Sequence, residues 1–420
     1  MRRSADVVIR MLLNSDNLNI KLLFPLKLDW EQWACAKPDV LFSEKVIDCL
    51  NALSASLLKD KQSRIYPDVI TFAFFCRKAN LLAQKKQYVG ADNEISGGSI
   101  RLGRGVLFHV APSNVPINFG YSLITGLLSG NHNVVRVSSK EFPQVDLIVR
   151  HLIEMAESQD YREVFDRIAL VKYDRSSDAT AFFSSFCHVR VIWGGDDTIN
   201  QIRKSQIPAR SFDVTFADRY SMAVINADEL VNERNMRKVA ESFYNDTYLF
   251  DQNACSAPHL IVWLGKLENM EKAQEIFWTA VQDEVKRKYE FQAVLAVDKL
   301  TAFYRQAIAM DIQKEPIEDN TLVRVKLKQL SPVIDEFRCA GGYFSEYVAS
   351  SLDEMAAIVK NRYQTLAYYG LNREELNRFV VDNRLVGIDR IVPLGETTSF
   401  SFTWDGYNLI QTLSRECIVL

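Results

Sequence analysis

The sequence has little of what membrane, secreted or metal-binding proteins need. No run of about 18 apolar residues occurs, which is the length that a membrane-spanning helix requires. Charged residues such as Asp6 and Arg10 interrupt the N-terminal segment, so it lacks the apolar core of a signal peptide. The seven cysteines show neither C-x-x-C spacing nor a His/Cys cluster, which argues against zinc and fits a reducing compartment. We therefore expect a cytoplasmic protein with no membrane span and no metal site.

The sequence also has no large excess of positively or negatively charged residues. The 50 basic and 53 acidic residues are interspersed and leave a formal net charge of −3, so no surface for nucleic acid or an anionic membrane is indicated. Internal repeats, low-complexity tracts and Pro-, Gly- or Ser-rich linkers are absent as well. With 420 residues, 48% of them hydrophobic, the chain has the composition of a well-packed protein of about two or three domains.

Common nucleotide-binding signatures are absent too. The chain has no G-x-G-x-x-G, GKS or GKT segment, which excludes an ordinary dinucleotide fingerprint and a Walker phosphate loop. A nucleotide would have to be bound in another way.

What is present is a change of pattern along the chain. Apolar residues recur at helical spacing through 42–58 and 67–82, which predicts a mostly helical layer over residues 1–95. From residue 105, β-rich runs alternate with helical segments, and this alternation is typical of a parallel sheet covered on both faces. The runs lie at 105–111, 133–139, 167–173, 189–195, 221–227 and 259–264, and helices are expected near 143–157, 229–250, 267–289 and 352–361.

The predicted fold class is therefore α/β, with two doubly wound parallel-sheet domains and a helical N-terminal layer. We expect a nucleotide-binding domain over 96–220, to which residues 390–420 return, and a catalytic domain over 221–389. Because no linker separates them, the two domains should share a close interface with the site between them.

One cysteine differs from the others in its surroundings. Cys49 and Cys76 lie among apolar residues at helical spacing, which predicts buried core positions. Cys255 lies in DQNACSAP, a polar segment that breaks periodicity and indicates a loop before the strand at 259–264. A cysteine on such a loop is a candidate nucleophile, although most intracellular cysteines are inert.

A second candidate segment follows the run at 105–111. It reads Pro112, Ser113, Asn114, Val115 and Pro116, and a helix is expected directly after it. Ligands of open parallel sheets bind where a strand leads into the N-terminus of a helix, so Asn114 is a candidate site residue. A helix cap is the structural alternative for this residue.

Two further strand ends carry candidate residues. Alternation along 133–140 would place Arg136, Ser138 and Lys140 on one face, suited to a ribose or its phosphate, and a solvated strand end is the alternative. Gly194 and Gly195 precede a helical segment, an arrangement that favours anions but is common at strand ends.

The order of these segments carries a family resemblance. PSNVP, VVRVSSK, WGG and the cysteine loop follow one another as in the aldehyde dehydrogenase superfamily. FHVAPSNVPINFGYSL, GNHNVVRVSSKEFPQ, DQNACSAP and WDGYNLI closely resemble its acyl-CoA reductases of the LuxC type, from about residue 65 to the end. The resemblance implies an aldehyde-dehydrogenase-like fold and reduction of a fatty acyl thioester to an aldehyde with NADPH.

The resemblance also implies roles for single residues. Cys255 corresponds to the nucleophile, and the Asn114 side chain with the Cys255 backbone N–H corresponds to the oxyanion hole. Arg136 stands where the superfamily usually has a lysine at the adenosine ribose, which suits the 2′-phosphate of NADPH. The cofactor-binding residues implied are Pro112, Ser113, Arg136, Ser138, Lys140, Gly194 and Gly195.

One departure from the superfamily bears on the reaction. Hydrolytic members carry a glutamate that activates water for deacylation, whereas TFADRYS here puts Phe216 near that position and offers only Asp218 as a partial substitute. An acyl-cysteine would then be discharged by hydride or by a thiol. The implied partners are acyl-CoA, an acyl-protein synthetase or acyltransferase, and further copies of the chain in a homo-oligomer.

Two other functions stay open. One is a cysteine-dependent acyltransferase or thioesterase with a Cys–His pair, since His109, His188 and His259 all flank strand ends. The other is a non-catalytic acyl-binding subunit of a fatty acid reductase complex that keeps the fold without the activity.

Overall fold

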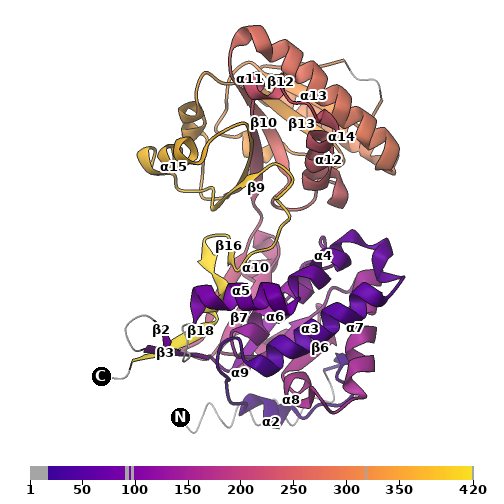
Figure 1. The fold of residues 1–420 in the computed structure, drawn as a ribbon, viewed down its shortest axis with the longest axis vertical. Helices are drawn as coiled ribbons and strands as arrows, with labels where there is room; N and C mark the ends of the chain where they lie inside the picture. The colour runs from indigo at the N-terminus through magenta and orange to yellow at the C-terminus, as the bar shows by residue number, and fades with distance from the viewer. Residues whose placement is uncertain (1–17, 90–93, 96–98, 317–318, 419–420) are drawn as a thin grey trace. The chain divides into compact units, whose positions relative to one another are not determined.

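The computed structural model describes residues 18–89, 94–95, 99–316 and 319–418. The chain folds as two compact units (Figure 1): unit 1 contains residues 1–217 and 407–420, and unit 2 contains residues 218–406. The sequence predicts the corresponding boundaries at 220/221 and 389/390. The part of the predicted helical layer before residue 18 lies outside the described residues.

Unit 1 is built on a six-stranded sheet with the order β1-β6-β5-β4-β7-β8. β1 is antiparallel to β6, and all other neighbours are parallel. Every residue of β4 and β7 is buried, as expected for strands with helices on both faces. The strands are β1 (Lys21–Phe24), β4 (Val106–Val110), β5 (His132–Arg136), β6 (Ile168–Lys172), β7 (Val189–Trp193) and β8 (Phe212–Phe216).

Helices connect the parallel strands of unit 1. They are α6 (Asn118–Leu128), α7 (Pro143–Ala156), α8 (Arg162–Phe165), α9 (Ala179–Phe186) and α10 (Asp196–Arg203). The N-terminal helices are α2 (Trp30–Ala34), α3 (Glu44–Lys59), η2 (Ser63–Ile65), α4 (Pro67–Phe75) and α5 (Lys78–Tyr88). α3 packs against α6 and α7, so this helical layer covers the helices on one face of the sheet.

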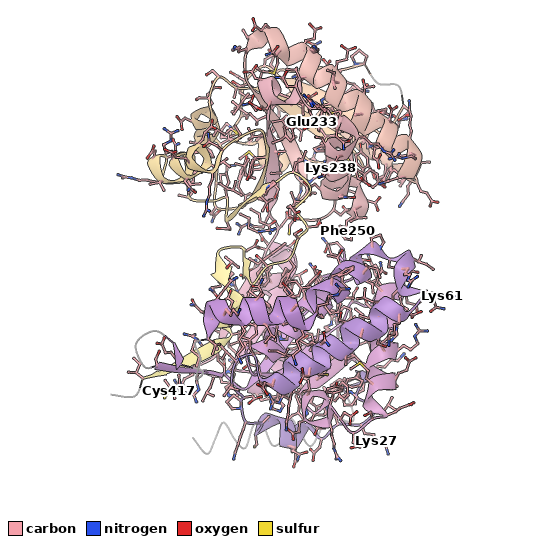
Figure 2. All side chains as sticks on the ribbon, viewed as in Figure 1. Lys27, Lys61, Glu233, Lys238, Phe250 and Cys417 are labelled. Atoms are coloured by element: carbon pink, nitrogen blue, oxygen red, sulfur yellow. The ribbon has the colours of Figure 1, made fainter. Side chains whose placement is uncertain are left out.

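The C-terminal segment belongs to unit 1. β18 (Ser414–Ile418) pairs antiparallel with β3 (Ser99–Gly103), which also pairs with β2 (Glu94–Ile95). Cys417, labelled in Figure 2, is exposed on β18. Short elements precede this strand: β16 (Thr403–Trp404), β17 (Tyr407–Asn408) and α16 (Leu409–Thr412).

Unit 2 is built on a seven-stranded sheet with the order β11-β12-β13-β10-β9-β14-β15. The edge strand β11 is antiparallel to β12, and the other neighbours are parallel. The strands are β9 (Tyr220–Asn226), β10 (Pro258–Leu264), β11 (Ile312–Lys314), β12 (Val323–Leu327), β13 (Tyr343–Val348), β14 (Tyr363–Tyr369) and β15 (Arg390–Pro393).

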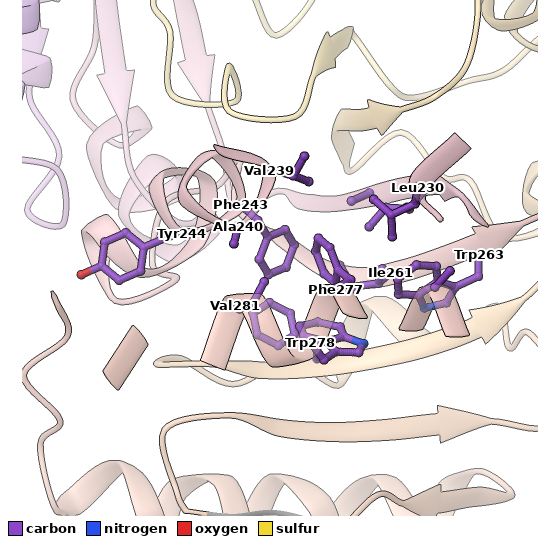
Figure 3. Packing of buried hydrophobic residues seen from close by; sticks show 14 of the residues in the cluster. Leu230, Val239, Ala240, Phe243, Tyr244, Ile261, Trp263, Phe277, Trp278 and Val281 are labelled. Carbon is purple, nitrogen blue, oxygen red and sulfur yellow. The ribbon is translucent and has the colours of Figure 1, made fainter. Parts of the chain in front are cut away.

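Both faces of this sheet are buried because successive strand residues alternate between two cores. Ile261 and Trp263 of β10 join a cluster with α12 (Met236–Thr247) and α13 (Leu267–Lys288), in which Phe243 and Phe277 pack edge to face at 5.1 Å (Figure 3). Leu260 and Val262 belong to the cluster on the other face. The other helices of unit 2 are α11 (Ala227–Leu230), η3 (Tyr248–Phe250), α14 (Val294–Ala309), η4 (Ile334–Glu336), η5 (Leu352–Ala357) and α15 (Arg373–Asp382).

Two helices expected in unit 2 differ from the prediction. The stretch 229–250 is interrupted because the Asn235 side chain caps a new helix, accepting a hydrogen bond from the Lys238 N–H. The stretch 352–361 forms only the short helix η5, since the strand β14 begins at Tyr363. The amphipathic helix expected over 267–289 is confirmed as α13.

Candidate active site

The carboxyl end of the unit 1 sheet carries the loops predicted to bind the cofactor. β4 and β7 pair directly, Val110 opposite Ile192, although β5 and β6 separate them in the sequence. Ligands of doubly wound sheets bind at such a switch in strand order. Pro112 and Ser113 follow β4 and Gly194 follows β7, so these residues leave the sheet at neighbouring strand ends.

Asn114 is exposed in the loop after β4. The structural alternative for this residue, a helix cap, is wrong, because α6 begins at Asn118 and its N-cap residue is Ile117. The assignment of Asn114 to an oxyanion hole stays a prediction.

Arg136 ends β5 with part of its hydrogen-bonding capacity unused. Its guanidinium lies over the Tyr173 ring, 4.8 Å from the centroid, and its Nη2 donates to the Tyr173 carbonyl oxygen at 3.4 Å. Its buried Nε has no hydrogen-bond partner among the described residues. Burial lowers the pKa of Arg136, and the positive charge of Arg175 acts in the same direction. Two neighbouring cations with an unused donor favour an anion.

These two arginines line a cavity of about 1680 Å³ in unit 1. Its walls include Ser176, Ser177 and Asp178 before α9, and residues of α9 and α10. The serine hydroxyls could donate to a phosphate, and the Asp178 carboxylate could accept from a ribose hydroxyl. The cavity therefore offers an anion-binding end and a groove beside two helices.

Ser138 and Lys140 lie beyond the end of β5, so strand alternation does not place them with Arg136 as the sequence predicts. The Ser138 hydroxyl is buried and accepts a hydrogen bond from the Lys140 backbone N–H at 3.1 Å, which closes a local turn. The Lys140 side chain is exposed. Their part in cofactor binding stays a prediction.

Of the two glycines after β7, only Gly195 leaves open space at the start of α10, since a Cβ on Gly194 would lie 3.1 Å from the Thr198 side chain. Gly195 is the N-cap residue of α10, and a Cβ added there would meet no atom within 4 Å. Asp196 and Asp197 occupy the first helical turn. Their carboxylates already interact with the helix dipole and oppose a second anion, which offsets the anion-favouring geometry expected from the sequence.

Phe216, which the sequence resemblance puts near the glutamate position of hydrolytic dehydrogenases, belongs to an aromatic stack. Phe216 ends β8 and lies on Trp193 at the end of β7, with ring centroids 3.7 Å apart. Asp218, the expected substitute base, accepts two hydrogen bonds from Arg338 at 2.6 and 2.5 Å and one from Arg362 at 3.3 Å. Both oxygens of the Asp218 carboxylate are therefore engaged by guanidinium groups.

The cysteine loop of unit 2 begins with an unusual backbone. Asp251 and Gln252 both adopt positive φ angles, 52° and 60°, which non-glycine residues rarely do. The buried Gln252 side chain compensates: its Nε2 donates to the Pro258 and Tyr343 carbonyl oxygens, and its Oε1 accepts from the Gly342 and Tyr343 N–H groups, all within 3.1 Å. These bonds fix the loop to β10 and β13.

Cys255 is partly buried in this loop and is held at two points. Its carbonyl oxygen accepts a hydrogen bond from the Ser221 hydroxyl at 2.8 Å, and the same hydroxyl accepts from the Thr365 N–H at 3.1 Å. Its Sγ accepts a hydrogen bond from the Gln364 side-chain amide at 3.2 Å. β9 and β14 therefore fix both the backbone and the sulfur.

The burial of the Cys255 sulfur and the charges near it favour its protonated form. Burial raises the pKa of Cys255 to about 11, the negative charge of Asp405 acts in the same direction, and the Gln364 hydrogen bond and the Arg219 charge oppose it. Cys49 and Cys76 are buried, as the sequence predicts, and burial alone raises the pKa of Cys49 to about 12. Cys255 thus differs from them in having a polar partner.

The histidines proposed for a Cys–His pair have structural surroundings. His109 is buried, bonds Ser122 through Nδ1 at 2.7 Å and Asn133 through Nε2 at 3.1 Å, and burial lowers its pKa to about 4. His188 accepts from the Val106 N–H at 3.0 Å. His259, the histidine of unit 2, stacks on Tyr220 at 5.9 Å, and burial lowers its pKa to about 3.

Three residues of the site went unnoticed in the sequence. No sequence pattern pointed to Arg175, because Arg136, which lies near it in the structure, is distant in the chain. The sequence did not indicate Gln364 in RYQTLAYY either, since its partners Cys255 and Asp405 lie in loops that are distant in the chain. Asp405 carried one, because it belongs to WDGYNLI, a segment that contributes to the family resemblance.

Two negative findings apply to the described part of the chain. None of its helices is long and apolar enough to cross a membrane. Nor do its His, Cys, Asp and Glu residues form a group of three or more that could hold a metal ion.

Comparison with known proteins gives a family and a fold. A family model described as acyl-CoA reductase (LuxC) matches residues 91–416. The long-chain acyl-protein thioester reductase of Vibrio harveyi is 22% identical over 71% of this chain and 60% of its own length, and that of Photorhabdus luminescens is 22% identical over 74% and 62%. The chain thus spans about 60% of the length of these relatives.

Solved structures of aldehyde dehydrogenases share the fold. A benzaldehyde dehydrogenase from Corynebacterium glutamicum matches with a TM-score of 0.60 and 12% identity, covering 92% of this chain and 86% of that enzyme. Lactaldehyde dehydrogenase from Escherichia coli matches with a TM-score of 0.59 and 11% identity, covering 93% and 88%. The predicted fold class, α/β and aldehyde-dehydrogenase-like, is confirmed.

Proposed function

This chain belongs to the LuxC family of acyl-CoA reductases, and on that premise we propose that it reduces a fatty acyl thioester to the aldehyde with NADPH and releases the thiol. The observation that carries the proposal is the Cys255 loop, in which two neighbouring strands hold a partly buried sulfur beside an amide donor. The relatives named above reduce acyl-protein thioesters, so the acyl donor is either coenzyme A or the thiol of a partner protein.

The chemistry of the first step follows from the groups at the loop. The Cys255 sulfur forms the new C–S bond at the thioester carbonyl, the leaving group departs as a thiolate with the electrons of the broken C–S bond, and the proton lost from Cys255 ends on that released thiol. The thiol released has a pKa of about 8.5, so it needs no strong acid to leave. The Asn114 side chain and the Cys255 N–H are the proposed donors to the oxyanion.

The cofactor assignment is supported by the cavity of unit 1. Arg136, Arg175 and the serines beside them would hold the ribose and 2′-phosphate of NADPH, with the unused Nε of Arg136 as one donor. Bound there, the cofactor supplies the hydride that takes the acyl group to the aldehyde level. The other proposed contacts, by Pro112, Ser113, Ser138, Lys140, Gly194 and Gly195, lie at or just after the ends of β4, β5 and β7.

In the second step, the fate of the acyl-cysteine depends on whether one of the described residues can activate water for hydrolysis. Phe216 cannot activate water, and Asp218 is engaged by two arginines. An acyl-cysteine here should therefore persist in water, which favours a reductase over a thioesterase. Partner proteins, a homo-oligomer and a cytoplasmic location are part of the same proposal.

The test is an incubation with a long-chain acyl-CoA, with and without NADPH. We expect NADPH consumption in step with aldehyde formation, and without NADPH an acyl adduct on the Cys255 peptide in mass spectrometry. Cys255→Ala should abolish both while the fold persists, because truncating one loop side chain opens little cavity. Cys339→Ala, which removes another partly exposed cysteine of unit 2, should leave both intact. An adduct on a different cysteine would contradict the nucleophile assignment.

A further inference from the structure

A chain of three side chains links the Cys255 sulfur to a buried carboxylate. The Nε2 of Gln364, a fully buried residue of β14, donates to the Cys255 Sγ at 3.2 Å and also to the Asp405 Oδ1. We propose, on the premise that Cys255 is the nucleophile, that Gln364 is a positioning residue that donates a hydrogen bond to the sulfur, and that Asp405 fixes the orientation of its amide.

The orientation follows from what each group can accept. A thiolate and a carboxylate only accept hydrogen bonds, whereas an amide has one donating and one accepting end. With the NH₂ group between them, the two N–H bonds of Gln364 serve one acceptor each. The flipped amide would place Oε1 against the Asp405 carboxylate, and against the sulfur whenever it is a thiolate. Asp405 therefore selects the conformer that serves the sulfur.

Asp405 is itself held in a defined position and charge state. It lies between β16 and β17 with a positive φ of 48°, and its other oxygen, Oδ2, is buried without a hydrogen-bond partner among the described residues. Burial raises its pKa to about 6, so the group is ionised at neutral pH. The charged groups that act on it are Arg219, Arg390 and Asp389, of which Arg390 lies over the Trp404 ring at 4.2 Å.

The carboxylate has two opposite effects on the sulfur. Its charge alone disfavours the thiolate, because like charges repel. By holding the Gln364 amide, it favours the thiolate through a hydrogen bond to the charged form. The charges of Asp405, Arg219 and Arg390 all act on the sulfur. Removing Gln364 separates the two contributions of Asp405, because it abolishes the hydrogen bond and leaves the three charges in place.

The experiment measures alkylation of Cys255 by iodoacetamide between about pH 7 and 9, where the rate follows the thiolate fraction. Peptide mass spectrometry reports the Cys255 peptide, and the exposed Cys35 and Cys417 serve as internal references. Gln364→Met, of similar volume but without a donor, should slow alkylation of Cys255 roughly tenfold. An unchanged rate would overturn the role of Gln364.

The role of Asp405 is tested by a double-mutant cycle. Asp405→Asn should speed alkylation by a larger factor in the Gln364→Met background than in the wild type, because only there does the charge act alone. Equal factors would show that Asp405 acts by charge without the amide and would overturn its role. If circular dichroism shows that Gln364→Met is unfolded, Gln364→Asn takes its place, since its shorter amide cannot reach both acceptors.

A matched control separates this effect from the loss of any buried amide. Gln306 of α14 is also fully buried in unit 2, and its amide bonds Ser345 and the Tyr343 hydroxyl instead. Gln306→Met should leave the Cys255 rate unchanged. Alkylation needs neither acyl-CoA nor NADPH, so the two proposals can fail separately. Absence of reductase activity would contradict the proposed function without affecting the alkylation result. Unchanged alkylation in Gln364→Met would contradict the role of Gln364 without affecting the proposed function.

Discussion

At the scale of single residues, the Arg136 Nε, which has no hydrogen-bond partner among the described residues, is the proposed contact with the 2′-phosphate of NADPH. A charge-assisted contact with a 2′-phosphate is stronger than one with a hydroxyl. Arg136→Ala should therefore raise the KM for NADPH about tenfold to a hundredfold and change that for NADH little, and steady-state kinetics with both cofactors would show it. Arg175→Ala should act in the same direction, because it lines the same cavity.

Arg150→Ala is the matched control for this prediction. Arg150 of α7 pairs with Asp60 at the end of α3, and it does not line the cavity. Its loss should leave both KM values unchanged. Equal increases for NADPH and NADH in Arg136→Ala would show that Arg136 does not recognise the 2′-phosphate.

A second prediction at this scale concerns the lifetime of the acyl-cysteine. Labelled acyl-CoA is loaded, the excess is removed, and loss of label is timed with and without NADPH. Label should stay on Cys255 in buffer and leave as aldehyde when NADPH is added, because neither Phe216 nor Asp218 provides a free base. Asn114→Ala should slow loading roughly a hundredfold to a thousandfold, since it removes one oxyanion donor.

Rapid release of free fatty acid without NADPH would contradict this assignment. Asp218 would then be the first residue to test, with Asp218→Asn expected to stop the hydrolysis. That outcome would favour the thioesterase alternative over the reductase.

At the scale of elements, the loop from Asp251 to Pro258 depends on one buried amide. Gln252→Met would leave two N–H groups and two carbonyl oxygens of β10 and β13 without partners. Denaturant unfolding should show a loss of about 3 to 5 kcal/mol. The two positive φ angles would lose their support, so acyl transfer to Cys255 should also fall at temperatures where the variant stays folded.

Gln306→Met again provides the comparison. It removes a buried amide of the same unit that does not contact the loop, so it should lower stability without lowering acyl transfer in the folded protein. Equal losses of acyl transfer in both variants would show that Gln252 has no special role in the loop.

The elements also show how far the sequence can lead. Every β-rich run named from the sequence, from 105–111 to 259–264, contains a strand, because local alternation and apolar content are properties of the run itself. β12, β13, β14 and β15 were not anticipated. β14 contains Gln364, a polar residue whose partners lie 109 and 41 positions away, and no local pattern can specify such contacts.

The same limit applies to the candidate site. Cys255 stands out locally because its loop is polar, whereas Arg175 and Gln364 acquire a role only through residues that folding brings beside them. At Ser138 a local pattern was present but misleading. Alternation continues in the sequence after Arg136, but the strand β5 ends at Arg136 and a turn follows.

At the scale of the whole molecule, buried neutral histidines should make the protein sensitive to acid. Burial lowers the pKa of His109 to about 4 and of His259 to about 3, while the unfolded chain titrates near 6.5. Between these values the unfolded state binds more protons, so stability is present above pH 6.5 and is lost as the pH falls. Asp246 and Asp405, with pKa values raised to about 6, act in the opposite sense.

Replacing His259 measures how much this one histidine contributes to the loss of stability at low pH. The free energy of unfolding should fall between pH 7 and pH 5 by about 2 kcal/mol less in His259→Phe than in the wild type. Urea unfolding at both pH values measures the difference. An identical fall in both proteins would show that the pKa of His259 is the same in the folded and the unfolded state.

The pairing of β18 with β3 has a consequence for how the protein is made. Gly103 lies opposite Ser414, and all of unit 2 is encoded between these two strands. At a synthesis rate of about 5 to 20 residues per second, β3 leaves the ribosome on the order of 15 to 60 s before its partner exists. During that interval the edge of β3 that β18 later covers has no partner on the nascent chain. The two clusters on the faces of the unit 2 sheet contain only residues of unit 2, so this unit can fold before unit 1 is complete.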